Sequence, residues 1–125
     1  MGALNAPQLQ ASHVVFDDCK LDQAWFRASS LDHVRFDGCD LTEADFYRAT
    51  ITDSLMVRCR LAGAELSQST IDDLVLNGSR LEGLKGLDAL RNAVVGSDQV
   101  VELAAAVLAA RNVRVDDEIL DAERG

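Results

Sequence analysis

The sequence is poor in aromatic residues, which make up only 5 % of its 125 residues although 48 % are hydrophobic. Aliphatic side chains must therefore fill any core of ordinary size. Long hydrophobic runs are also missing, since no stretch comes near the ~20 apolar residues that a membrane-spanning helix needs. Residues 1–13 have no charged side chain and thus lack the basic start of a secretory signal. We expect neither a signal peptide nor a membrane partner.

Cysteines and positive charges are few. The three cysteines are an odd number without a C-x-x-C pair, which is typical of a reducing compartment, so we expect a cytoplasmic protein. Twelve basic residues stand against 21 acidic ones, and the net charge is −9. Because like charges repel, this balance disfavours direct binding to nucleic acid or to an anionic membrane. A solvated acidic surface is the simplest explanation of the charge, and a basic protein remains a possible partner.

The most regular feature of the chain is a five-residue repeat. Every fifth residue from Phe16 to Leu81 is large and apolar, fourteen times in succession, and the residue two places before each is mostly small. A longer period is present as well, since Cys19, Cys39 and Cys59 are twenty residues apart. Neither a helix nor an ordinary strand has a period of five. We infer that each unit makes one side of a square, so that four units close a coil of twenty residues.

This geometry predicts which side chains face the core. The large residue of each unit points to the axis and stacks on its counterpart in the next coil, as for Phe26 and Phe46. Successive coils should be about 4.8 Å apart, the distance between paired strands. Fourteen units make about 3.5 coils. Leu74 is large for the small position of its unit and is the candidate for a local bulge.

These residues resemble the pentapeptide-repeat motif, A-(D/N)-L-x-x. The closest matches are Ala24-Trp25-Phe26, Ala44-Asp45-Phe46 and Ala64-Glu65-Leu66, and the resemblance covers residues 14–83. It implies an all-β solenoid, namely a right-handed quadrilateral β-helix. Some members of this family are DNA mimics that bind DNA gyrase and confer fluoroquinolone resistance, and many of those dimerise through C-terminal helices.

We expect three parts in the chain. Residues 1–13 form an N-terminal cap or a degenerate first coil, and residues 14–83 form the β-helix. Residues 84–125 form a C-terminal cap with a helix at about 98–111, for which Ser97 is a plausible N-cap, and an acidic tail. Such a helix can cover the open end of the last coil, where core residues and unpaired backbone would otherwise be exposed.

The expected helix is apolar on two sides. One stripe includes Val100 and Val107, and the other includes Val101 and Leu108. Both stripes could pack on the last coil, or one could be free to pair with a second copy of the chain. We state a homodimer through this helix as a hypothesis.

Two further clusters are candidate protein contacts. Leu55, Val57 and Val75 should lie together and exposed on one side of the solenoid, unless a terminal segment folds back over them.

The second cluster consists of Trp25, Tyr47 and Arg48, on the side that carries Ala24 and Ala44. Tryptophan, tyrosine and arginine are the residue types that dominate protein interfaces.

The sequence gives little indication of a catalytic site or a metal site. The three cysteines form a line rather than a convergent set, so they fit buried apolar fillers better than zinc ligands. His13, His33, Asp53 and Asp73 form an outward column that could raise a histidine pKa or hold a metal weakly, although a surface accident is the simpler interpretation. The sequence has no supported Ser-His-Asp set, phosphate-binding loop or H-E-x-x-H motif. We expect no enzyme, no cofactor and no resident metal.

Two functions remain. The first is a non-enzymatic protein-interaction scaffold with an unknown protein partner. The alternative, implied by the resemblance, is a DNA mimic that binds gyrase. Residues 14–83 carry thirteen acidic and seven basic residues, whereas DNA presents one negative charge per ~1.7 Å without interruption. The mixed charge favours the scaffold.

Overall fold

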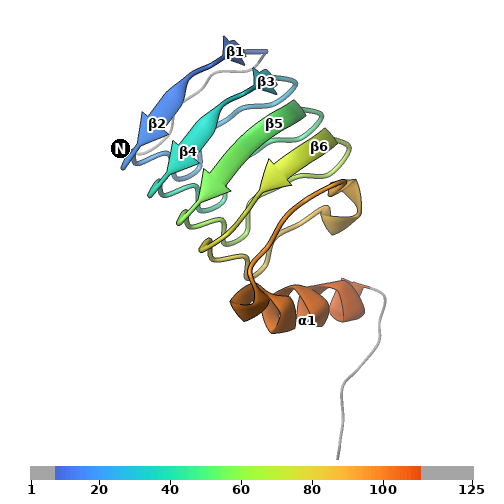
Figure 1. The fold of residues 1–125 in the computed structure, drawn as a ribbon. Coiled ribbons are helices and arrows are strands. Elements are labelled where there is room, and N and C mark those ends of the chain that lie inside the picture. The colour runs from blue at the N-terminus through green and yellow to red at the C-terminus, as the bar shows by residue number, and fades with distance from the viewer. Residues whose placement is uncertain (1–7, 111–125) are drawn as a thin grey trace, which may run out of the picture.

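The chain winds into a stack of coils with a helix at its C-terminal end, as the computed structural model of residues 8–110 shows (Figure 1). The elements of these residues are β1 (Gln10–Ser12), β2 (Val15–Asp17), β3 (Ser30–Asp32), β4 (Arg35–Asp37), β5 (Thr50–Val57), β6 (Thr70–Val75), the 3-10 turns η1 (Leu87–Ala89) and η2 (Ser97–Gln99), and the helix α1 (Val100–Ala110). The predicted fold, an all-β solenoid of the quadrilateral β-helix type, is confirmed. No helix within residues 8–110 is long and apolar enough to cross a membrane.

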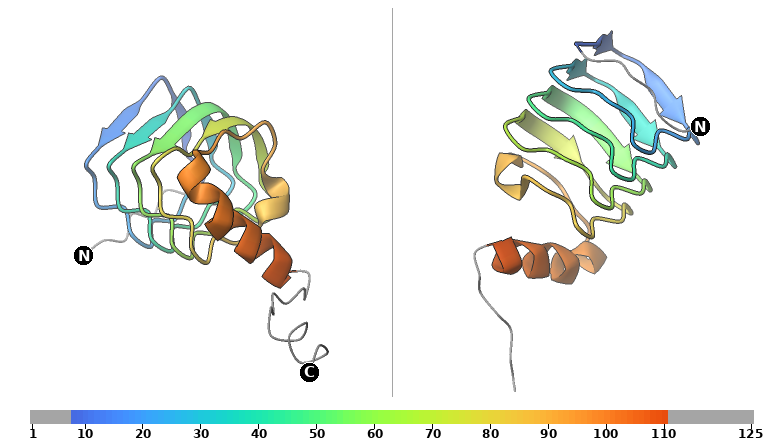
Figure 2. Two further views of the ribbon diagram at one scale, coloured as in Figure 1. Left: turned by 60° about the horizontal axis from the view of Figure 1, so that its bottom comes forward. Right: turned by 180° about the vertical axis from the view of Figure 1, so that it is seen from behind.

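Every ladder of the solenoid joins residues twenty positions apart. On one side β1, β3, the first part of β5 and β6 stack in parallel, so that Thr50 pairs with Thr70. On the next side β2, β4 and the second part of β5 stack, and Phe36 pairs with Met56. Single parallel bridges join the coils along the two remaining sides. Figure 2 shows the resulting stack of closed coils from two directions. The period of twenty in the sequence is therefore the register of the structure.

The corners explain why the repeating unit has five residues. From Gln8 to Gly83 every fifth residue has a positive φ, so the backbone turns at the same point of each unit. This left-handed conformation costs an L-residue roughly 1–2 kcal/mol. Most of these corners carry side chains other than glycine. Packing between the coils must therefore offset strain along the whole solenoid.

The axis is filled as the repeat predicts. Phe26, Phe36 and Phe46 are fully buried, and the ring of Phe26 stacks on that of Phe46 with 5.1 Å between their centroids. Phe16 lies at the first coil, where it stacks on Phe36 at 4.8 Å and is only partly buried. Aliphatic side chains continue the core toward the C-terminal end. Burial of each such side chain contributes about 1.5–3 kcal/mol.

The expected bulge at Leu74 is wrong. Leu74 is fully buried inside β6 and pairs in register with Ser54 of β5. The small serine on the preceding coil leaves room for the larger side chain. The extra volume is thus absorbed inside the stack without disturbing the ladder.

Cys39 and Cys59 act as small buried residues, as expected, and they also complete hydrogen bonds between coils, whereas Cys19 is partly exposed. The Cys39 thiol donates to the Phe16 carbonyl (3.2 Å), and the Cys59 thiol donates to the Phe36 carbonyl (3.3 Å). Burial raises the pKa of Cys59 to about 12, so this thiol stays protonated at neutral pH. A cysteine at the small position therefore fills space and provides a donor for the preceding coil.

The C-terminal end of the solenoid is closed by one polar residue. Gln99 is buried, its Nε2 donates to the carbonyls of Leu76 (2.7 Å) and Ser79 (2.8 Å), and its Oε1 accepts from the Gly96 amide (2.7 Å). Glu102 adds a second link, because its Oε1 accepts from the Leu81 amide at 2.6 Å. The bonds to Leu76, Ser79 and Leu81 attach η2 and α1 to the last coil, and they provide partners for the Ser79 carbonyl and the Leu81 amide.

The helix begins slightly later than the sequence indicates. Gly96 stands at the N-cap position before η2, and the expected N-cap Ser97 is the first residue of that turn. The α-helix then runs over Val100–Ala110, within the expected range of about 98–111. The final residue of that range and the expected acidic tail lie outside the described residues.

Candidate protein-contact surfaces

One side of the solenoid holds an arginine between two aromatic rings. The Arg27 Cζ atom lies 5.4 Å from the ring centroid of Trp25 and 5.3 Å from that of Tyr47. Its Nε also forms an ion pair with Asp45 at 2.6 Å. Trp25 is 41 % exposed, so a large apolar surface faces solvent beside a charged group. We call these residues the Trp25–Arg27–Tyr47 cluster.

The structure adds Arg27 to the residues predicted for this cluster. Within residues 8–110, Arg27 makes the cation–π contacts, whereas Arg48 stands exposed at a corner with a φ of 60°. Arg27 and Tyr47 are twenty residues apart and thus neighbours on successive coils. The period could therefore have identified Arg27, but adjacency in sequence to Tyr47 favoured Arg48.

A neighbouring side carries a row of apolar residues. Leu55 and Val75 pair in register and are partly exposed, and Val94, which is 52 % exposed, forms a bridge beside Val75. We call these three residues the apolar column. Arg35 separates this column from Val15 on the first coil, which is 64 % exposed. Val94, from the C-terminal part of the chain, extends the column instead of covering it.

Val57 does not belong to the exposed surface, which corrects the expectation from the sequence. Only 8 % of Val57 is exposed. It pairs in register with Asp37, and that carboxylate binds Arg58 (2.6 Å) and Arg35 (2.9 Å) beside it. The hydrogen bonds from Arg58 and Arg35 hold the pKa of Asp37 below its ordinary value. This ionic cluster occupies the surface next to Val57 and reduces its access to solvent.

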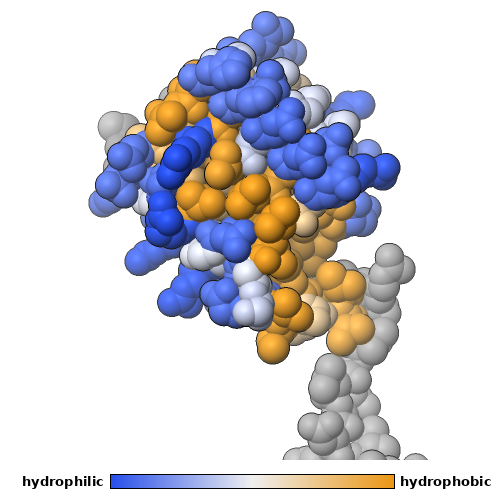
Figure 3. Space-filling model, in the orientation of Figure 1, coloured by the Kyte–Doolittle hydropathy of each residue, from blue (hydrophilic) through white to orange (hydrophobic). Residues whose placement is uncertain are grey.

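The helix keeps part of both apolar stripes in solvent. Val101 is 80 % exposed, Val100 52 % and Val107 41 %. Leu103 packs against the core and Leu108 is partly buried. The interpretation in which both stripes pack on the last coil is therefore wrong for the described part of the helix. Figure 3 shows apolar side chains that gather over the later coils and continue onto the helix.

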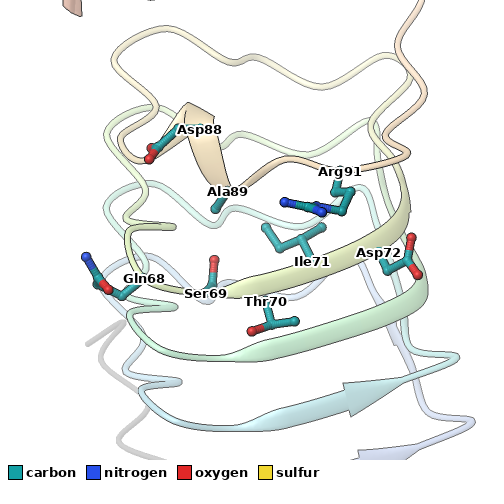
Figure 4. Close-up of a pocket in the computed structure, with 8 residues that line it drawn as sticks. All are labelled: Gln68, Ser69, Thr70, Ile71, Asp72, Asp88, Ala89 and Arg91. Atoms are coloured by element: carbon teal, nitrogen blue, oxygen red, sulfur yellow. The ribbon is translucent and has the colours of Figure 1, made fainter.

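A polar hollow of about 390 Å³ lies beside β6 and η1 (Figure 4). Asp72 and Arg91 stand at one end of it, and Gln68 and Asp88 at the other. Its lining contains no histidine or cysteine among the residues that the structure describes. The hollow offers charged groups for binding. Among the described residues, the Ser69 hydroxyl donates to the Leu66 carbonyl rather than to a carboxylate of the lining.

The predicted column of histidine and aspartate residues is present at one corner. His13, His33, Asp53 and Asp73 all have positive φ and are exposed on successive coils. The rings of His13 and His33 stack with centroids 4.7 Å apart. The structure adds Asp32, whose carboxylate lies 3.0 Å from His33 Nδ1. The predicted column did not include Asp32, because this residue is one position out of the register that joins the other four.

The repeat and its geometry can now be compared with known proteins. Residues 1–66, more than half of the chain, match the family described as "Pentapeptide repeat region". The chain belongs to the pentapeptide-repeat family. The resemblance noted from the alanine-containing units is thereby confirmed. No curated protein matches this pentapeptide-repeat sequence.

The solved structure of another pentapeptide-repeat protein shares the fold. HetL, a protein involved in heterocyst differentiation regulation from the cyanobacterium Nostoc sp. strain PCC 7120, is 24 % identical with a TM-score of 0.58. The match covers 74 % of this chain and 44 % of HetL. A trypsin-treated form of QnrB1, a plasmid-mediated fluoroquinolone resistance protein, is 12 % identical with a TM-score of 0.40, over 91 % of this chain and 97 % of that one.

Rfr23, from the cyanobacterium Cyanothece 51142, is 13 % identical with a TM-score of 0.31. That match covers 76 % of this chain and 86 % of Rfr23. The likeness to HetL is evidence for a shared fold only. The present chain spans less than half of HetL's length. The other two similarities are too low to carry an argument.

Proposed function

We propose that this pentapeptide-repeat protein is a non-enzymatic scaffold that binds a protein partner. The observation that carries the proposal is the Trp25–Arg27–Tyr47 cluster. Its arginine is fixed by Asp45 and by two rings, so little side-chain entropy remains to be lost on binding. Tryptophan, tyrosine and arginine are also the residue types that most often dominate interfaces. Repeat proteins commonly bind through surfaces that such stacked rows create.

The shape of the molecule supports binding rather than catalysis. The interior of the described solenoid is filled with apolar side chains, and the lining of its polar hollow has hydroxyl and carboxylate groups but no histidine, lysine or cysteine. A net charge of −9 makes nucleic acid and anionic membranes unsuitable as direct partners. The buried free thiols of Cys39 and Cys59 fit a reducing, cytoplasmic location.

A partner that uses this cluster should lose affinity for the variant Trp25→Ala. Proteins captured from the source cell by the immobilised chain are identified by mass spectrometry, and the dissociation constant of each purified candidate is measured. We expect a loss of about 2 kcal/mol, roughly thirtyfold in Kd, for a central interface tryptophan. Lys20→Ala, an exposed residue on another side of the solenoid, serves as the control. Equal binding of every partner to both variants would contradict the proposed contact.

The exposed apolar side chains of α1 suit a second copy of the chain as the partner. Val101 and Val107 leave apolar surface in solvent, and a two-fold pairing of helices would bury it. We expect light scattering to give twice the 13.5 kDa of one chain, and Val101→Glu to reduce that mass to one chain. Val15→Glu is the matched control, because this exposed valine lies on the first coil. A monomeric wild-type chain at high concentration would remove the proposed homodimer.

Gyrase-directed DNA mimicry has weaker support. Basic residues are interspersed on the described solenoid, where Arg27 neutralises Asp45 and Arg58 neutralises Asp37. DNA has no such interruptions in its charge. A supercoiling assay distinguishes the two functions, since inhibition of gyrase by the wild-type chain would favour mimicry.

A further inference from the structure

One corner of the solenoid combines imidazole and carboxylate groups from two successive coils. His33 and Asp53 occupy equivalent corner positions twenty residues apart, with φ values of 54° and 47°. Asp32 ends β3 immediately before His33. The repeat therefore sets the spacing of His33 and Asp53, while the chain direction at the corner brings Asp32 beside them.

The three side chains approach one another closely enough to share an ion. His33 Nδ1 lies 3.0 Å from Asp32 Oδ1, and His33 Nε2 lies 4.0 Å from Asp53 Oδ2. One potential ligand atom from each residue lies within 4.8 Å of the other two. Ligands of a tetrahedral zinc ion, at bonds of ~2.0–2.2 Å, are roughly 3.4 Å apart. All three side chains are at least partly exposed to solvent, so small rotations are sufficient to bring their ligand atoms from within 4.8 Å to the spacing that zinc needs.

Neighbouring groups orient the cluster. Thr52 Oγ1 donates a hydrogen bond to Asp32 Oδ1 at 3.0 Å. The ring of His13 stacks on that of His33 with an angle of 20° between their planes. Such contacts restrict the rotation of a ligand side chain and strengthen metal binding.

The charge around the corner is unbalanced. Asp73 follows Asp53 on the next coil. Asp72 on that coil pairs with Thr52 and accepts a hydrogen bond from Asn92 Nδ2 at 2.6 Å. Within residues 8–110, none of the carboxylates at this corner forms an ion pair with lysine or arginine. A cation at this corner would relieve the repulsion among these carboxylates.

We propose that Asp32, His33 and Asp53 form a binding site for a divalent transition-metal ion, for which Zn²⁺ is the probe. A nitrogen and two carboxylate oxygens suit zinc, cobalt, nickel and manganese, and water can complete the coordination. The ion joins two successive coils at the corner. The site is independent of the proposed scaffold function, because its residues lie apart from the Trp25–Arg27–Tyr47 cluster in the repeat. It replaces the simpler interpretation of the histidine–aspartate column as a surface accident.

Calorimetric titration of the full chain with Zn²⁺ tests the site. We expect one ion per chain for the wild type, and binding weaker by about tenfold or more for His33→Asn and for Asp53→Asn. His13→Phe is a matched control, since it removes the other imidazole of this corner column but keeps a ring that can stack on His33. This control should bind nearly as tightly as the wild type. Circular dichroism checks that every variant is folded.

A second readout locates the ion. Titration with paramagnetic Co²⁺ should broaden the ring signals of His33 in the nuclear magnetic resonance spectrum, and it should do so in a Cys19→Ser background as well. This background excludes the partly exposed thiol of Cys19 as the source of binding. The proposal is overturned if wild-type binding does not saturate, if His33→Asn and Asp53→Asn bind like the wild type, or if Cys19→Ser abolishes binding.

Discussion

The variant Gly86→Ala should lose about 3 kcal/mol or more of unfolding free energy, from the left-handed backbone and from steric overlap together. Gly86 has a φ of 79°, and an added Cβ would lie 2.3 Å from the Ser67 amide nitrogen and 2.6 Å from the Leu66 carbonyl carbon. These are backbone atoms of the preceding coil. They cannot move aside without breaking the ladder, in which the Leu66 amide donates to the Lys85 carbonyl at 2.9 Å.

Gly83→Ala is the matched control for this prediction. Gly83 also has a left-handed φ, of 69°, but the nearest atom to an added Cβ is the Gly63 nitrogen at an ordinary 3.5 Å. We expect only the conformational cost, about 1 kcal/mol. Urea denaturation followed by far-ultraviolet circular dichroism measures both variants. Equal losses of unfolding free energy for Gly83→Ala and Gly86→Ala would show that the close approach of the Ser67 and Leu66 backbone does not determine the cost at Gly86.

Phe36→Ala should destabilise the protein by about 3–5 kcal/mol, the usual cost of removing a fully buried phenylalanine. The ring of Phe36 is stacked on Phe16 at 4.8 Å and meets Phe26 and Phe46 edge-on at 6.1 and 6.4 Å. Removal leaves a cavity between coils that touch only their immediate neighbours. Stability in a solenoid depends on these nearest-neighbour contacts, so more distant coils cannot compensate for the contacts that Phe36 loses.

Phe16→Ala supplies the comparison. Phe16 is the other ring of this stacked pair, but it lies on the first described coil, where it remains partly exposed. Its truncation removes less buried surface, so the midpoint of urea denaturation should fall less than for Phe36→Ala. A loss at Phe16 as large as at Phe36 would contradict the assignment of Phe36 to the centre of the stack.

The periodic part of the fold could be predicted because each unit repeats the same backbone conformation. The interval of five residues set the corners, and the interval of twenty set the pairing, so Phe26 and Phe46 were correctly placed on the axis. Only the sizes of neighbouring side chains could disturb this pattern. At Leu74 they did not, because Ser54 left space beside it.

The candidate contact surfaces were predicted less well. The sequence placed Trp25 and Tyr47 together with Arg48, while the side chain of Arg27 contacts both rings, that of Trp25 on its own coil and that of Tyr47 on the next. Val57 was expected in solvent, although the ionic cluster around Asp37 lies next to it. Long, charged side chains can take several directions from one backbone position, so their final contacts do not follow from spacing alone.

The amino-acid sequence by itself determined the solenoid, its register and the residues that line its axis, because a strict repeat allows one backbone geometry to satisfy every coil. The tertiary structure decided how the stack ends and where its surface groups meet. Gln99 closes the last coil through three hydrogen bonds to backbone groups of Leu76, Ser79 and Gly96. Such contacts depend on the length and direction of individual side chains in three dimensions, and a periodic pattern in the sequence does not specify them.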